Sequence, residues 1–248
     1  MLTGRNRRKT HAGIPHGSTC NLGTRLQIYY QYNSGESAEL WSDQSVNNND
    51  AVQEVADNQP VAVTGGGLDF EDTDEASTAS SMQFTNFSIP VDTDFLAFIA
   101  CNLETSALNG LNCYLSDSGG EVLEFVSHTK HQLKTGEANT NLIHNAVFTI
   151  NQAEKTVFVL HRTNGATGTL KMYKSGLLCN GNNNTGSTNA GNLDLQNLGV
   201  KNNPSSESHW FDGIMYDVGV ITGNAASDIN REIITDYLLG KHGMERLG

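Results

Sequence analysis

The stretch MQFTNFSIPVDTDFLAFIA, residues 82–100, contains two strand patterns separated by a turn. In the first part apolar and polar residues alternate, with Met82, Phe84 and Phe87 as apolar points, which is typical of a strand with one buried face. The second part, residues 95–100, is apolar without a break, so we expect a central strand that is covered on both faces. Together the two patterns predict a β-sheet with a buried interior.

Similar patterns continue on both sides of this stretch, at intervals of roughly 8–12 residues, as in sandwiches and barrels. The two clearest are residues 146–150 and 156–161, and residues 112–115 and 122–126 predict a hairpin around Ser118-Gly119-Gly120. The sequence therefore predicts an all-β fold whose further strands lie at residues 25–30, 60–64, 68–70, 169–173 and 213–221.

The two ends of the chain differ from the middle. Residues 1–25 show neither strand nor helix periodicity, so we divide the chain into a basic arm, 1–25, and one sandwich domain, 26–248. Near the C-terminus the period changes to that of a short helix with Ser227 as N-cap and Gly240 or Gly243 at its end. We expect its apolar face to comprise Ile229, Ile233, Ile234, Tyr237 and Leu238.

Charge and cysteine content exclude several functions. The formal net charge of -12 argues against nucleic-acid binding, because phosphates need a basic face. No apolar run is long enough to predict a membrane span, and the N-terminus lacks the apolar core of a secretory signal. The four cysteines have no zinc-type spacing and are expected to be free thiols, although Cys101 and Cys113 could face each other across a hairpin.

Two segments carry a family resemblance. The first is LWSDQSVNNNDAVQEVADNQPV, residues 40–61, followed by VTGGGLDFEDTDE, residues 63–75. The second is WFDGIMYDVGVITGNAASDINREIITDYLLGKHG, residues 210–243. They resemble the opening and closing segments of concanavalin A-like, laminin-G-type domains. The matching residues are Trp41, Asp43, Ser45, Asn47, Asn49, Ala51, Gln53, Asn58, Pro60, Gly65 to Phe70, Phe211, Gly213, Tyr237, Leu238, Lys241 and Gly243.

This resemblance implies a concanavalin A-like jelly-roll sandwich with an extended N-terminal arm and a short C-terminal helix. The sequence departs from the family pattern at Val46, at Glu71-Asp72 and at Lys174-Ser175-Gly176, all of which replace turn residues. From the residues themselves, we expect Asp43, Ser45, Asn47 and Asn49 to bond nearby backbone amides in an Asx-rich turn packed over Trp41.

No catalytic pattern is evident. Glucanases of similar fold carry a Glu-x-Asp-x-x-Glu strand that places carboxylates on one face, whereas the nearest acidic stretch here, residues 71–75, has a different spacing. The histidines are scattered and none accompanies a nucleophile motif. We expect no enzymatic activity and no cofactor, with calcium at Asp69, Asp72 and Asp74 as the alternative.

One functional hypothesis is a structural or decoration protein of a tailed-phage virion, since the resemblance includes many proteins of marine phages and cyanophages. Such a protein would be assembled in the host cytoplasm, in several copies, on capsid, neck or tail proteins. We expect the arm to dock on an acidic neighbour while the jelly roll projects outward. The residues expected to make this contact are Leu2, Arg5, Arg7, Arg8, Lys9 and Ile14.

The alternative hypothesis is a carbohydrate-binding, lectin-like module for attachment to a host surface. Sandwich lectins hold sugars with exposed aromatic rings and with Asn or Asp side chains on loops. The candidates are Tyr173 and Trp210 as aromatic platforms and Asn182 and Asn183 in the loop of residues 179–192, which is rich in Asn and Gly. Trp210 fits the core equally well, because it directly precedes a strand.

Overall fold

The computed structural model describes residues 25–32, 37–71, 79–104, 112–127, 130–135, 138–143, 154–163, 169–179, 192–201 and 209–247. Three sequence predictions lie outside these residues: the basic arm, the strand at 146–150 and most of the Asn-rich loop.

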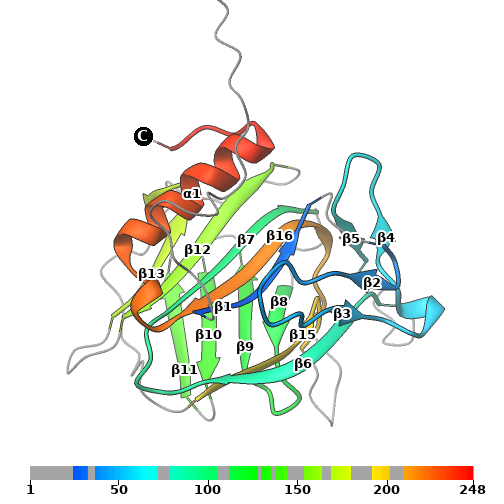
Figure 1. The fold of residues 1–248 in the computed structure, drawn as a ribbon, viewed down its shortest axis with the longest axis horizontal. Coiled ribbons are helices and arrows are strands. Elements are labelled where there is room, and N and C mark those ends of the chain that lie inside the picture. The colour runs from blue at the N-terminus through cyan, green and yellow to red at the C-terminus, as the bar shows by residue number, and fades with distance from the viewer. Residues whose placement is uncertain are drawn as a thin grey trace, which may run out of the picture.

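Two antiparallel sheets form a sandwich (Figure 1). The first sheet has the order β14 (Leu177–Leu178), β13 (Thr169–Lys174), β12 (Thr156–Thr163), β7 (Phe95–Leu103), β16 (Gly213–Thr222), β5 (Leu68–Phe70) and β4 (Val61–Ala62), with β1 (Leu26–Gln31) also paired to β16. The second has the order β11 (Ala138–Ile143), β10 (Lys130–Thr135), β9 (Val122–Ser127), β8 (Asn112–Ser116), β15 (Leu193–Leu198), β6 (Met82–Ile89), β3 (Ala51–Val52) and β2 (Leu40–Trp41). The predicted all-β jelly-roll sandwich is confirmed.

Strand β7 explains why residues 95–100 are uniformly apolar. It lies between β12 and β16, and its side chains alternate between two apolar layers. Phe95, Ala97 and Ile99 face the core between the sheets, whereas Leu96 and Phe98 pack on the outer face under the C-terminal helix. A central strand covered on both faces, as predicted, follows from this arrangement.

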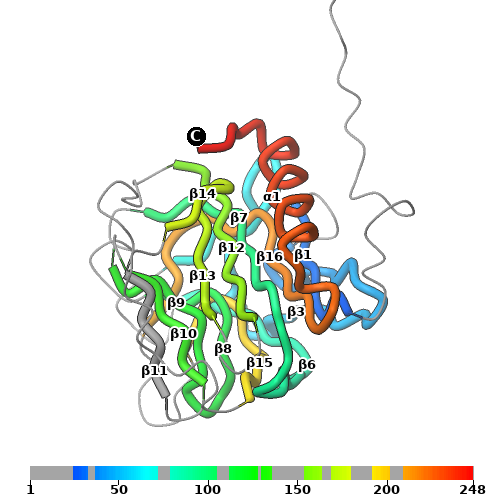
Figure 2. Tube along the Cα trace, turned by 90° about the vertical axis from the view of Figure 1, so that its left-hand side faces the viewer, coloured from blue at the N-terminus to red at the C-terminus, as the bar shows by residue number. Residues whose placement is uncertain are grey.

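Helix α1 (Asp228–His242) lies on the outer side of the first sheet, away from the second (Figure 2). Its N-cap is Ser227, whose side chain accepts a hydrogen bond from the backbone of Asn230, as the sequence predicted. Gly243 ends the helix with a φ of 68°, in the left-handed region that favours glycine, so the C-cap is Gly243 rather than Gly240.

The predicted apolar face of α1 is partly wrong. Ile229 is 73% exposed, while the buried side chains are Arg231, Ile234, Thr235, Leu238 and Leu239. At 3.6 residues per turn, Ile229 projects roughly opposite to this set. Arg231 occupies the buried position because its guanidinium lies 3.8 Å from the centre of the Tyr173 ring, a cation–π contact that replaces aliphatic packing.

The three cysteines within the described residues are free and buried. Cys101 lies on β7 and Cys113 on β8, so the two belong to opposite sheets and do not face each other across a hairpin. The predicted hairpin at this place consists instead of β8 and β9, which pair antiparallel. Burial raises the pKa of the Cys113 thiol well above its ordinary value, so this thiol is unreactive.

The Asx-rich segment after Trp41 connects the two sheets. The Asp43 carboxylate accepts hydrogen bonds from the backbone amides of Tyr29, Ser45 and Asn49 at 2.8, 2.9 and 2.8 Å. The side-chain amide of Asn49 in turn donates a hydrogen bond to the Thr85 carbonyl and accepts one from the Thr85 backbone N–H. Tyr29 belongs to the first sheet and Thr85 to the second, while Trp41 is fully buried beneath the turn. The predicted turn is confirmed for Asp43 and Ser45 and for Trp41 as its core anchor, whereas the Asn47 side chain donates to the carbonyls of Leu26 and Gln27 and the Asn49 side chain bonds Thr85.

Replacing Asp43 with Asn should lower the free energy of unfolding by about 2–3 kcal/mol, because an amide cannot accept all of these bonds and loses the charge that strengthens them. Urea unfolding followed by circular dichroism measures the change. The matched control is Asp57→Asn at an exposed position, which should unfold like the wild type. Equal stability of both variants would contradict a supporting role for the carboxylate.

Candidate functional site

A β-bulge in β16 builds the most distinctive polar cluster of the described residues. The pairing of β16 with β7 shifts register between Met215 and Asp217. Met215 and Val218 face the core between the sheets, so Tyr216 and Asp217 both project from the outer face. Bulges commonly re-aim side chains in this way. Here the bulge places a carboxylate beneath the last turn of α1.

Asp217 is fully buried and receives three donors. The Tyr29 hydroxyl and the Lys241 ammonium donate to its Oδ1 at 3.0 and 2.7 Å, and Nε2 of His242 lies 2.5 Å from its Oδ2. Burial, and then the neighbouring Asp217 carboxylate, raise the pKa of Tyr29, so its hydroxyl stays protonated and acts as a donor. These contacts hold the helix end on the sheet and offset the cost of burying the charge.

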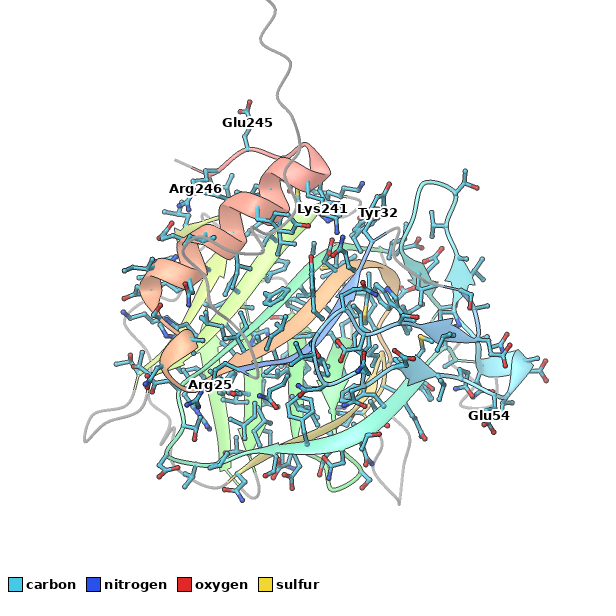
Figure 3. All side chains as sticks on the ribbon, in the orientation of Figure 1. Arg25, Tyr32, Glu54, Lys241, Glu245 and Arg246 are labelled. Carbon is cyan, nitrogen blue, oxygen red and sulfur yellow. The ribbon has the colours of Figure 1, made fainter. Side chains whose placement is uncertain are left out.

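Aromatic rings surround this buried centre. The His242 ring lies between Tyr32 and Tyr216, with centroid distances of 5.3 and 5.4 Å. The Lys155 ammonium is 4.1 Å from the centre of the Tyr216 ring, and the Lys241 ammonium is 5.7 Å from that of Tyr32. Figure 3 shows Lys241 and Tyr32 side by side near the C-terminal end of α1.

We name Tyr32, Lys155, Tyr216, Tyr237 and Lys241 the tyrosine–lysine site. Tyr216 is 6% exposed and forms its floor, whereas the other four side chains are partly exposed. They come from three places in the chain: the end of β1, the start of β12 and helix α1. The site therefore offers aromatic surface and two ammonium groups above a buried carboxylate.

The triple glycine singled out in the sequence lies beside this site. Gly67 has a φ of +94°, and a Cβ there would lie 2.8 Å from the Met215 carbonyl oxygen and 3.0 Å from the Tyr216 ring. A Cβ on Gly65 would lie 3.7 Å from the Tyr32 hydroxyl. At Gly67 the turn between β4 and β5 can therefore approach Tyr216 closely because it lacks a side chain, whereas a Cβ on Gly65 would lie at ordinary contact distance from Tyr32.

The two aromatic residues predicted to stack on sugars, Tyr173 and Trp210, do not belong to the tyrosine–lysine site. Tyr173 and Trp210 are each 7% exposed, Tyr173 beneath Arg231 and Trp210 in a small cluster with Ala79 and Val200. Covered in this way, neither ring has the open face that sugar stacking requires, so this structure does not support their proposed role. The other predicted binding residues lie outside the described residues: Asn182, Asn183, Leu2, Arg5, Arg7, Arg8, Lys9 and Ile14.

Of the residues considered for calcium, Asp72 and Asp74 also lie outside the described residues, and Asp69 lies on β5. A different trio, Asp117, Glu121 and Asp194, brings carboxylate oxygens within 4.8 Å of one another. This donor set suits a hard cation. However, Asp117 already accepts a hydrogen bond from the backbone of Glu121, and Glu121 accepts one from the backbone of Asp194. The trio is therefore explained as the polar side of a turn.

Sequence reasoning missed Tyr32, Lys155, Tyr216 and Asp217 as site residues. The available signal was Tyr237 and Lys241, which belong to the closing motif of the family resemblance and both lie in this site. The bulge that turns Asp217 outward is a property of strand pairing and has no signature in the local sequence.

No protein-family model and no curated protein matches the sequence. Solved structures do match, and they include binding domains of botulinum neurotoxins. One is the serotype D ligand-binding domain in complex with N-acetylneuraminic acid (TM-score 0.53, 15% identity, 88% of this chain and 51% of that chain). Another is a structure of botulinum neurotoxin type C, whose cell entry is described as dependent on two ganglioside molecules. It has a TM-score of 0.51 and 18% identity and covers 89% of this chain and 53% of that chain.

A third is the receptor-binding domain of serotype D, with a TM-score of 0.52 and 11% identity, covering 89% of this chain and 54% of that chain. At such identities the likeness shows the fold alone. The chain spans about half the length of these domains. They are binding domains by description and not catalytic ones. Among the described residues, no helix is long and apolar enough to cross a membrane.

The pKa of Asp69 gives a pH-dependent prediction. Burial, and then the Glu71 and Glu104 carboxylates, raise its pKa from 3.8 to about 6 in the folded protein. The folded state therefore binds more protons than the unfolded state between about pH 4 and 6, so stability falls as pH rises through this window. Asp69→Asn removes this penalty and should stabilise the protein at pH 7.5 by about 1 kcal/mol after allowance for solvent screening.

At about pH 3, below the unfolded-state value of 3.8, the same variant should match the wild type, because Asp69 is then largely protonated in both the folded and the unfolded state. Urea unfolding at both pH values measures the difference, with Asp57→Asn as the exposed control. A gain of the same size at both pH values would contradict the assigned pKa.

Proposed function

We propose that this protein is a non-catalytic carbohydrate-binding module and that it holds its glycan at the tyrosine–lysine site. The observation that carries this proposal is the convergence of Tyr32, Lys155, Tyr237 and Lys241, all partly exposed, from separate parts of the fold. Sugars present apolar C–H faces and polar hydroxyl groups on the same ring. The site supplies a counterpart to each.

The aromatic rings and the ammonium groups have distinct roles in this proposal. Tyrosine gives a large apolar face together with a polar hydroxyl, which suits a surface that is partly wet. Lys155 makes no ion pair with any described residue and lies over two tyrosine rings, so its ammonium is available to a ligand oxygen. Lys241 is oriented by Asp217, and its ammonium lies 5.7 and 5.9 Å from the centres of the Tyr32 and Tyr237 rings.

The structural likeness supports the class of ligand. Two of the similar domains are described with N-acetylneuraminic acid and with gangliosides, both of which are or contain sugars. Because this chain spans only about half of those domains, their ligands do not transfer to it directly. The likeness agrees with a binding role, and we propose the tyrosine–lysine site as its location.

A glycan array with the full chain, followed by calorimetric titration of any bound glycan, tests the proposal. Tyr32→Ala and Lys155→Ala should each weaken binding by about tenfold, which corresponds to roughly 1.4 kcal/mol. Lys155→Ala should change the melting temperature little, whereas Tyr32→Ala also removes ring contacts with Tyr216 and His242, so its melting temperature is measured beside its binding. Lys130→Ala on β10 of the other sheet is the matched control. Failure to bind any glycan at millimolar concentration, or unaltered binding by both variants, would refute this function.

A second proposed role is that of a structural component of a tailed-phage virion, present in several copies and docked through residues 1–25. The observation that favours docking is the charge of this segment, which carries Arg5, Arg7, Arg8 and Lys9 on a chain of net charge -12. The two roles are compatible, because a particle can use a surface domain to contact a host glycan.

A further inference from the structure

The charge of the chain is divided into three blocks. Residues 1–25 contain five basic and no acidic residues, a charge of +5. Residues 26–129 contain no Lys or Arg and 17 of the 27 acidic residues, a charge of -17. Residues 130–248 contain ten basic and ten acidic residues, so the blocks account for the total of -12. The surplus of negative charge therefore lies entirely in the block that includes β1 to β9.

Within this acidic block, residues 37–63 form an edge lobe. The lobe contains β2 and β3 at the edge of the second sheet, the 3-10 helix η2 (Ala56–Asn58) and β4 at the edge of the first sheet. It projects to one side of the sandwich, on the right in Figure 1. Two sheet edges thus lie in a single segment of the chain, and edges readily accept further chain.

Exposed apolar side chains are concentrated on this lobe. Leu40 and Val52 are cross-strand partners in the β2–β3 hairpin and are 36% and 40% exposed. Val55 and Val61 follow at 58% and 59%. With Val46 at 61%, residues 37–63 contain five of the eight large apolar side chains that are exposed among the described residues. Such clustering marks an interaction surface more than isolated exposed residues do.

The charged residues on the same surface are all acidic. Glu39 and Glu54 flank the exposed face of the hairpin, Asp57 lies in η2, and all three are exposed. The lobe contains no Lys or Arg at all. A partner for this surface must therefore carry positive charge together with a few apolar side chains.

The first 24 residues of the chain have this composition. They combine Arg5, Arg7, Arg8 and Lys9 with Leu2 and Ile14, and they contain no acidic residue. We propose that these residues of one copy bind the edge lobe of a second copy. The four cations pair with Glu39, Glu54 and Asp57, and Leu2 and Ile14 cover the exposed valines.

A second copy fits better than the chain's own lobe. Arg25, where the described chain begins, and Glu54 of the lobe lie on opposite sides of the molecule in Figure 3. An extended segment of 24 residues spans at most about 80 Å, so it can reach well beyond its own domain. Binding to a neighbour covers the exposed apolar and acidic side chains of the lobe without the segment crossing back over its own sandwich. Repetition of this contact joins copies head to tail.

Sedimentation of the full chain over a range of concentrations, together with two charge-reversal variants, tests the proposal. The arm variant is Arg5→Glu/Arg7→Glu/Arg8→Glu/Lys9→Glu, and the lobe variant is Glu39→Lys/Glu54→Lys/Asp57→Lys. Each alone should weaken self-association by at least about tenfold, and so should added salt, because exposed ion pairs are screened. The matched control is Glu154→Lys/Asp236→Lys/Glu245→Lys, which changes the charge equally at other exposed positions and should associate like the wild type.

Mixing the arm variant with the lobe variant gives the decisive measurement. The native arm of one then meets the native lobe of the other, so the mixture should associate although neither variant does so alone. Restoration in the mixture cannot result from misfolding. A wild-type chain that stays monomeric at all concentrations, a mixture that stays monomeric, or a control that dissociates as the variants do would each overturn the proposal. So would a cross-link between arm and lobe that forms within the monomer.

Discussion

The architecture depends on one carboxylate that binds backbone amides. Asp43 accepts hydrogen bonds from the amides of Tyr29, Ser45 and Asn49, and Asn49 continues the connection to Thr85 on the opposite sheet. The two faces of a sandwich are otherwise held together by apolar packing, which is non-directional and leaves the sheets free to slide. The directional bonds of Asp43 fix β1 relative to β6, and Tyr32 of the tyrosine–lysine site directly follows β1.

The sequence revealed those features whose cause is local. Residues 95–100 are apolar because both faces of β7 are covered, and Ser227 caps α1 because its hydroxyl reaches an amide three residues ahead. The Asx pattern was also readable, since its partners include amides within a few residues. The cap and the Asx turn have partners close by in sequence, whereas the apolar run of β7 shows only that both of its faces are covered and not which elements cover them.

Features that depend on partners far away in the sequence could not be predicted from the sequence. Arg231 is buried because Tyr173, on another element, offers its ring, and a helical pattern alone favoured Ile229 for the buried face. Tyr216 and Asp217 share a face because β16 bulges against β7. Tyr173 and Trp210 looked suitable for sugar binding by residue type, but tertiary packing covers both. Residue type shows what a side chain is able to do, while packing decides whether it is accessible.

The tyrosine–lysine site and the proposed docking surface are connected by the β4–β5 hairpin. β4 lies in the edge lobe, and the turn that follows places Gly65 next to the Tyr32 hydroxyl. Two backbone hydrogen bonds close the turn of this hairpin, from the Val63 amide to the Gly67 carbonyl and from the Gly66 amide to the Val63 carbonyl, and β5 pairs with β16 over three residues. Assembly through the lobe would therefore repeat the tyrosine–lysine site once per copy, and, if this site binds a glycan as proposed, multiple copies would gain avidity from geometry.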